Sequence, residues 1–317
     1  MKSHILTITE PDDITLAIKE LESQLSKIEL RKNTIGIVSV HPEFIHSGVY
    51  AAAAKGLPFN LVGGTTLSQS VNGTIGTHMF SIVVLTSDDC EFACSVSDPM
   101  TYEDISVIRG CYERTRAQLQ GDVKLALLYT PFIETGYVAT HMQAISKNDG
   151  IVPIFGAVPS ADLPSIVKDR RTVYSGCDYN DRLVLLLVSG NFSPAFYAVS
   201  ATSDSVQDAS AKVEPLSIIS KEAVMETLRD ILAQIKEDHT HKLVLMYSCL
   251  GRKISLLDES TAECDLIRVS LAGCGMSYAV SYACDVICLT SIPKVSGVSE
   301  AQASNNAHNC ALVACVM

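Results

Sequence analysis

The chain has 317 residues, of which 47% are hydrophobic and 19% are charged, so it can bury a sizeable core and is too apolar to be disordered. Its 24 lysines and arginines stand against 35 aspartates and glutamates, a formal net charge of −11. This balance argues against a nucleic-acid partner, because phosphates need a basic surface. The best apolar runs, residues 183–188 and 243–246, are strand-sized, so we expect no membrane insertion.

The same order of elements is predicted three times along the chain. Apolar residues at helical spacing predict amphipathic helices over residues 14–28, 101–119 and 224–235, the second starting at Thr101 with Asp104 at the spacing of a capping box. An apolar strand follows each helix, at residues 35–40, 125–130 and 243–248. A glycine after an apolar residue comes next, and a further apolar strand closes each unit, at residues 82–85, 183–187 and 311–314. The intervals between these landmarks are nearly equal, which indicates an internal repeat.

The fold class predicted from this pattern is α/β, with repeated helix–strand–helix–strand–strand modules forming mixed sheets covered by helices. Near-continuous apolar strands indicate sheets that are buried on both faces. The polar stretch 201–217 is the best candidate for a domain boundary. We therefore expect an N-terminal helical segment over residues 1–33, a domain of two modules over 34–200, and a third module over 218–317.

Glycines and threonines follow strands at two matching places. Gly63, Gly64, Thr65 and Thr66 come after the first module's second strand, and Gly156 occupies the corresponding place in the second module. Neither the dinucleotide fingerprint nor the phosphate-binding loop is present. Two interpretations stay open: a close approach of the backbone to a neighbouring strand, or turns that line a ligand crevice at the carboxyl ends of strands.

The spacing of cysteines and histidines predicts no metal site. Cys90 and Cys94, like the pair Cys284 and Cys288, are four residues apart in strand-like surroundings, which would separate the two thiols by about 13 Å. His239 and His241 flank a helix end without an obvious third ligand. We expect most of the 11 cysteines to be buried, reduced thiols in a cytoplasmic protein, since the first residues also lack the apolar stretch of a signal peptide.

Two candidate functional side chains, Cys249 and Arg252, follow the third main strand. Cys249 could be a nucleophile whose thiolate is stabilised by helix amides, with His41 or His308 as its base. The alternative is a small buried residue beside a satisfied histidine. Arg252 could bind a carboxylate through two parallel hydrogen bonds, or it could form a salt bridge that ties two elements together.

Four segments resemble FIST-domain proteins, in the order found in that family. They are residues 63–66 with 82–92, residues 153–157 with 172–176, residues 248–252 (Ser-Cys-Leu-Gly-Arg), and residues 307–312 (Ala-His-Asn-Cys-Ala-Leu). The similarity extends over residues 34–317 and makes residues 34–200 FIST N-like and residues 218–317 FIST C-like. One departure is that the family's Gly-Glu pair after Gly273 is missing, since Gly275 precedes Met276.

The resemblance implies an intracellular sensory protein, not an enzyme, that binds an amino acid or other small carboxylate and signals through a separately encoded partner. Its ligand-binding residues would be Gly63, Gly64, Thr65, Thr66, Gly156, Ser248, Cys249, Arg252, His308 and Asn309. No cofactor is expected, except that some family members bind haem and sense nitric oxide. A haem sensor using His41, His141 or His308 and a thiol enzyme using Cys249 therefore remain as alternatives, and self-association stays open.

Overall fold

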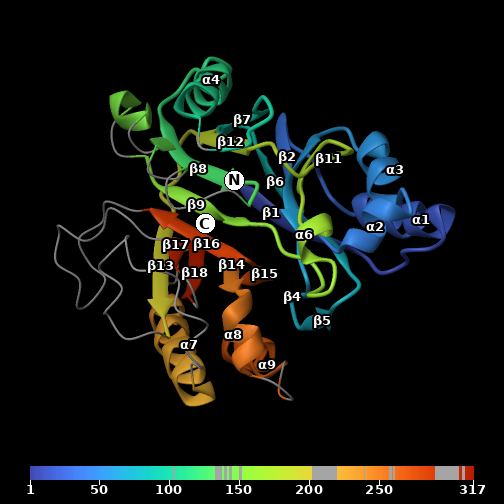
Figure 1. The fold of residues 1–317 in the computed structure, drawn as a ribbon, viewed down its shortest axis with the longest axis vertical. Coiled ribbons are helices and arrows are strands. Elements are labelled where there is room, and N and C mark those ends of the chain that lie inside the picture. Colours follow the sequence, from blue (N-terminus) through green and yellow to red (C-terminus); the bar gives the residue numbers. More distant parts are fainter. Residues whose placement is uncertain are drawn as a thin grey trace.

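The computed structural model describes residues 1–102, 104–132, 138, 141–142, 145–149, 152–201, 220–238, 240–256, 259, 261–289, 307–308 and 311–317. Most of the predicted boundary at 201–217, together with His239 and Asn309, lies outside these ranges. The fold is α/β with mixed sheets, as predicted (Figure 1). Within the described residues, no helix is both long and apolar enough to cross a bilayer.

The described strands form three six-stranded sheets. The first contains, in order, β1 (Lys2–Ile8), β6 (Phe80–Ser87), β2 (Asn33–Val40), β3 (Asn60–Thr65), β10 (Thr172–Tyr174) and β11 (Cys177–Tyr179). The second contains β7 (Glu91–Val96), β12 (Val184–Ser189), β8 (Val123–Tyr129), β9 (Ile154–Val158), β16 (Asp285–Leu289) and β17 (Ala307–His308). The third contains β13 (Ala195–Ser200), β18 (Ala311–Val316), β14 (Leu243–Cys249), β15 (Ser277–Ala283), β4 (Gln69–Val71) and β5 (Thr74–Gly76).

Each sheet is built in the same way. Its two central strands are parallel (β2 with β3, β8 with β9, β14 with β15), and the other pairs are antiparallel. In the structure, the first module runs from β1 to β6, the second from β7 to β12 and the third from β13 to β18. Four strands of each sheet come from one module, and the last two are a pair from another module. The second module contributes β10 and β11 to the first sheet, the third contributes β16 and β17 to the second, and the first contributes β4 and β5 to the third. The three modules therefore exchange strand pairs in a closed cycle.

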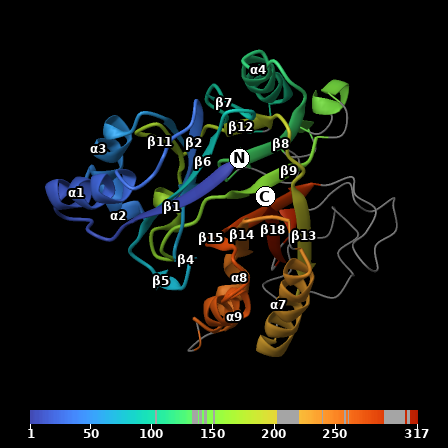
Figure 2. The same cartoon turned by 180° about the vertical axis from the view of Figure 1, so that it is seen from behind.

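Most helices lie at the periphery in groups that belong to separate modules (Figures 1 and 2). The first module has α1 (Ile14–Leu25), α2 (Pro42–His46) and α3 (Val49–Gly56), and the second has α4 (Ile105–Arg116), η1 (Lys147–Asp149) and α6 (Ile166–Asp169). The third has α7 (Lys221–Lys236), α8 (Leu250–Ser255) and α9 (Ala262–Leu271). The helix α6 lies apart from α4, beside α2 of the first module. Ser220 caps α7 by accepting from the Ala223 N–H at 3.1 Å, so the predicted third helix begins at a stabilised end.

The core has one central part shared by all sheets and an outer part in each module. Ile37, Leu127 and Leu245 point into the central cluster from the three sheets. The outer clusters pack helices against the other face of each sheet: α1 and α3 on the first sheet, α4 on the second, and α7 and α9 on the third. The predicted burial of the sheets on both faces is confirmed. The first 33 residues contain β1 as well as a helix, and β1 pairs with β6, so this segment is part of the first sheet.

Candidate functional site

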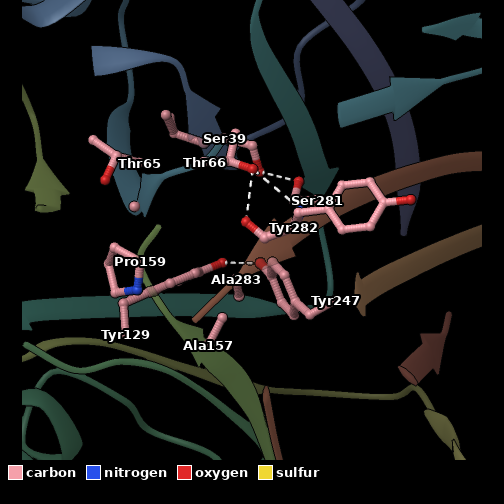
Figure 3. A pocket seen from close by; sticks show the side chains of 12 residues that line it. Ser39, Thr65, Thr66, Tyr129, Ala157, Pro159, Tyr247, Ser281, Tyr282 and Ala283 are labelled. Carbon is pink, nitrogen blue, oxygen red and sulfur yellow. Dashed lines mark hydrogen bonds between the residues drawn. The ribbon is translucent and has the colours of Figure 1, made fainter. Parts of the chain in front are cut away.

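Three equivalent strand ends meet where the modules join. In the parallel pairs, Val38 lies opposite Gly63, Leu128 opposite Gly156, and Met246 opposite Val280. The next residues along β2, β8 and β14 therefore occupy the same place in their modules, and these residues are Ser39, Tyr129 and Tyr247. Gly64 and Thr65 of β3, Thr66 directly after it, and residues of β9 and β15 line a cavity at the junction together with these three residues (Figure 3).

The junction cavity measures only ≈ 10 Å³, about the lower limit for one water molecule. Hydroxyl groups close it: the Tyr129 and Tyr247 oxygens are 2.6 Å apart, and the Ser281 hydroxyl donates to Ser39 Oγ at 2.6 Å (Figure 3). Burial raises the pKa of both tyrosines, so they are neutral at pH 7. The cavity thus offers neutral hydroxyls and no room for a substrate, and its contacts hold the three sheets together.

The predicted glycine turns are close approaches between strands. A Cβ at Gly63 would lie 2.0 Å from the Val38 carbonyl oxygen, and one at Gly156 would lie 1.8 Å from that of Leu128. The amides expected to hold a ligand already donate to protein carbonyls, since Thr65 N–H bonds Arg171 O at 2.8 Å and Thr66 N–H bonds Val40 O at 3.0 Å. The geometry matches the packing interpretation that the sequence left open.

Arg252 is fully buried and already paired. Its Nε donates to Glu263 Oε1 at 2.8 Å, and its Nη2 donates to the Val224 carbonyl at 3.0 Å. The Ser248 hydroxyl donates to the other Glu263 oxygen at 2.7 Å. Arg252, Glu263 and Ser248 are all 0% exposed. The structure therefore has the salt bridge between elements, and the carboxylate that Arg252 binds is that of Glu263.

The cysteine of the predicted thiol site is buried at the end of β14. Cys249 is 3% exposed, and its Sγ donates to the Cys284 carbonyl at 3.3 Å. His308 lies in β17 of the second sheet, whereas Cys249 ends β14 of the third. The ten cysteines of the described residues are free thiols, and most are buried, as predicted.

A different group of polar side chains meets where β2 ends. His41 caps the N-terminus of α2, Glu43 lies in the first turn of that helix, and His78 precedes β6. Their ligand atoms all lie within 4.8 Å of one another. His78 Nδ1 is 3.2 Å and His41 Nδ1 is 3.9 Å from the same oxygen, Glu43 Oε2. The fourth member, Asp162, places Oδ2 3.2 Å from His41 Nε2.

The strand pairing explains why these residues meet. Val40 of β2 is opposite Phe80 of β6, and the His41 N–H continues the pairing by donating to the Met79 carbonyl at 3.1 Å. This pairing brings His41 and His78 together although they are 37 positions apart in the sequence. Their ring centroids are 4.5 Å apart.

The protonation of His41 suits ligand binding. Its side chain is 4% exposed, and burial lowers its pKa further below 7, so the ring is neutral at pH 7. With Nε2–H donating to Asp162, the lone pair on Nδ1 faces Glu43 and accepts only a long 3.3 Å bond from the Glu43 N–H. Glu43 Oε2 is a buried atom without a hydrogen-bond partner in the described structure. A ring nitrogen of His41 and one of His78 thus lie close to a carboxylate oxygen of Glu43 that has no hydrogen-bond partner.

The chain resembles a solved protein structure over its whole length. No family model matches the chain, and no curated protein matches it. Among solved structures, a cyanuric acid hydrolase from A. caulinodans is similar, with a TM-score of 0.45 and 11% sequence identity, over 100% of this chain and 98% of that chain. The resemblance to FIST-domain proteins stays a prediction.

This match corrects the functional expectation from the sequence. We expected a sensory protein that is not an enzyme, whereas a solved structure that resembles the chain over its full length is that of a hydrolase. This finding contradicts the prediction of a non-enzymatic sensor, and haem binding stays an untested prediction.

Proposed function

We propose that the chain is a metal-dependent hydrolase whose zinc ion is bound by His41, Glu43 and His78. The observation that carries the proposal is that His41 Nδ1, His78 Nδ1 and Glu43 Oε2 lie within 4.8 Å of one another, and that this oxygen has no hydrogen-bond partner among the described residues. Two histidines and one glutamate are a ligand set of catalytic zinc sites, in which a water molecule takes the fourth position.

The distances fit a tetrahedral ion after small side-chain movements. Zinc bonds of about 2.0–2.1 Å at tetrahedral angles separate neighbouring ligand atoms by about 3.4 Å. The two nitrogens lie 3.2 and 3.9 Å from Glu43 Oε2. Coordination would give this oxygen a divalent cation as partner in addition to the His78 ring and would replace the long capping bond to His41 Nδ1.

The fourth position of such an ion would be open to solvent. The side chain of His41 is 4% exposed, whereas those of Glu43 and His78 are 46% and 56% exposed. A zinc ion held by these three residues would lower the pKa of a bound water to about 7 and so would supply hydroxide at neutral pH. The chemistry supplied would be hydrolysis of an ester or amide, in which the water oxygen would bond to the carbonyl carbon, the bond to the leaving group would break, and the leaving group would take a proton derived from the water.

The proposal is tested by zinc content together with hydrolysis of a chromogenic ester, p-nitrophenyl acetate, with and without EDTA. We expect one zinc per chain, hydrolysis that EDTA abolishes and zinc restores, and loss of both properties in His41→Ala and His78→Ala. His46→Ala is the matched control, because His46 lies on α2 with Glu43 but contacts Asp169 and is not one of the three ligands. Hydrolysis that is equal with and without EDTA, or zinc binding unchanged in both ligand variants, would contradict the proposal.

A further inference from the structure

We infer that Asp162, which belongs to the second module, is a positioning residue that makes His41 of the first module a competent metal ligand. The inference rests on the proposed function, because it concerns the same metal site. Asp162 Oδ2 is 3.2 Å from His41 Nε2, on the side of the ring opposite the nitrogen that faces Glu43 and His78.

A carboxylate at this position has a specific effect on a histidine ligand. A metal-bound imidazole generally donates its other ring N–H to a carboxylate or carbonyl, which fixes the tautomer and orientation of the ring and makes the ligand nitrogen more basic. Here the bond to Asp162 keeps the proton on Nε2 and leaves the lone pair of Nδ1 directed at the metal position. Replacement of such a partner typically weakens metal affinity about 10–100-fold.

The segment that bears Asp162 is held by all three modules. It leaves β9, and Ser160 anchors it: the Ser160 N–H donates to the Thr65 carbonyl of the first module at 3.0 Å. The Ser160 hydroxyl donates to the carbonyl of Tyr282 in the third module and accepts from the Leu67 N–H. Past Asp162, the Ser165 N–H closes a turn by donating to the Asp162 carbonyl at 2.9 Å. The carboxylate is thus placed by the assembled junction, and metal affinity depends on contacts between modules.

The chain contains a matched control for this pair. His46 Nε2 and Asp169 Oδ1 are also 3.2 Å apart, and this pair likewise joins α2 to the segment between β9 and β10. His46, however, is 55% exposed and is not part of the ligand group. A merely structural role in fastening α2 would be shared by both aspartates, whereas a positioning role belongs to Asp162 alone.

The test is a titration with Co²⁺, whose visible absorption reports ligand geometry, followed by competition with Zn²⁺. We expect Asp162→Asn to weaken affinity 10–100-fold and to change the Co²⁺ spectrum, and Asp169→Asn to change affinity less than twofold. Asp162→Glu, which restores a carboxylate, is expected to recover part of the affinity. Urea unfolding of each variant checks that the fold is retained.

The outcomes separate the inference from the proposed function. Equal affinities and spectra for Asp162→Asn and Asp169→Asn, with tight Co²⁺ binding by the unaltered chain, would overturn the positioning role and leave the metal site in place. Failure of the unaltered chain to bind Co²⁺ or Zn²⁺ would overturn the proposed function and the inference with it. Normal metal binding without ester hydrolysis would overturn the hydrolase alone.

Discussion

Replacing Glu263 with alanine is expected to destabilise the fold by about 3–5 kcal/mol, because it leaves the guanidinium of Arg252 buried without a counter-charge. Both side chains are 0% exposed, so water cannot compensate for the lost carboxylate. The substitution removes the 2.8 Å bond from Arg252 Nε and the 2.7 Å bond from the Ser248 hydroxyl. The bonds that Arg252 makes to Thr227 and Val224 remain, but they bring no negative charge.

The matched control is the ion pair between Arg268 and Asp265, whose atoms are 2.7 Å apart and whose side chains are 51% and 43% exposed. Asp265→Ala is expected to cost about 0–1 kcal/mol, because solvent screens an exposed pair. Urea unfolding followed by circular dichroism gives the free energy for each variant. A double variant, Arg252→Met with Glu263→Leu, is expected to lose less stability than Glu263→Ala, since no buried charge is left unpaired. Equal destabilisation by Glu263→Ala and Asp265→Ala would contradict the expectation.

Two further predictions follow from the packing and the charges. Gly156→Ala is expected to lower the free energy of unfolding in urea by more than about 3 kcal/mol, because the added methyl group would lie 1.8 Å from a carbonyl oxygen of β8. Gly56→Ala serves as its control, since nothing lies within 4 Å of the Cβ that it adds. Equal stability of the two variants would count against the close strand approach. Burial of Asp238 by itself raises the pKa of its carboxyl, but hydrogen bonds from the turn after α7 outweigh burial and lower the pKa to about 2. Because the folded pKa is below the unfolded value of 3.8, the carboxylate stabilises the fold by up to about 2 kcal/mol above pH 4, and this contribution disappears as the pH falls toward 2. The stability difference between the unaltered chain and Asp238→Asn should therefore shrink between pH 5 and pH 3, and a difference that does not depend on pH would argue against the lowered pKa.

The repeated modules could be predicted because their signals are local. The helix before β8 has apolar residues at a regular spacing, and the structure contains it as α4. Asp104 is its N-cap and Ile105 its first residue, so the start predicted at Thr101 is three residues too early for the cap. The long strands have six to eight residues, most of them apolar. Four of the exchanged strands have no such signal, since β4, β5, β10 and β11 have three residues each. Their positions depend on pairing with a sheet that another module builds, which no local pattern encodes.

The candidate metal site was missed for a related reason. His41 was noticed as a base or a haem ligand, but Glu43, His78 and Asp162 were not connected with it. The spacing rules for metal sites compare residues that are close in sequence, whereas His78 reaches His41 through the antiparallel pairing of β6 with β2. Asp162 reaches it from a different module. The closest available signal was the short sequence His41-Pro42-Glu43 directly after an apolar strand.

The cyclic exchange of strand pairs has a consequence for any shortened form of this chain. A single module would expose the edge of β3, β9 or β15, and its own strand pair would have no sheet to join. Exposed edges of this kind pair with other chains. Because the exchange closes after three steps, three copies of one module could satisfy every edge by passing the pair to the next copy, as in a C3 homotrimer. The single polypeptide therefore pairs its strand edges in the way that a ring of three identical subunits would.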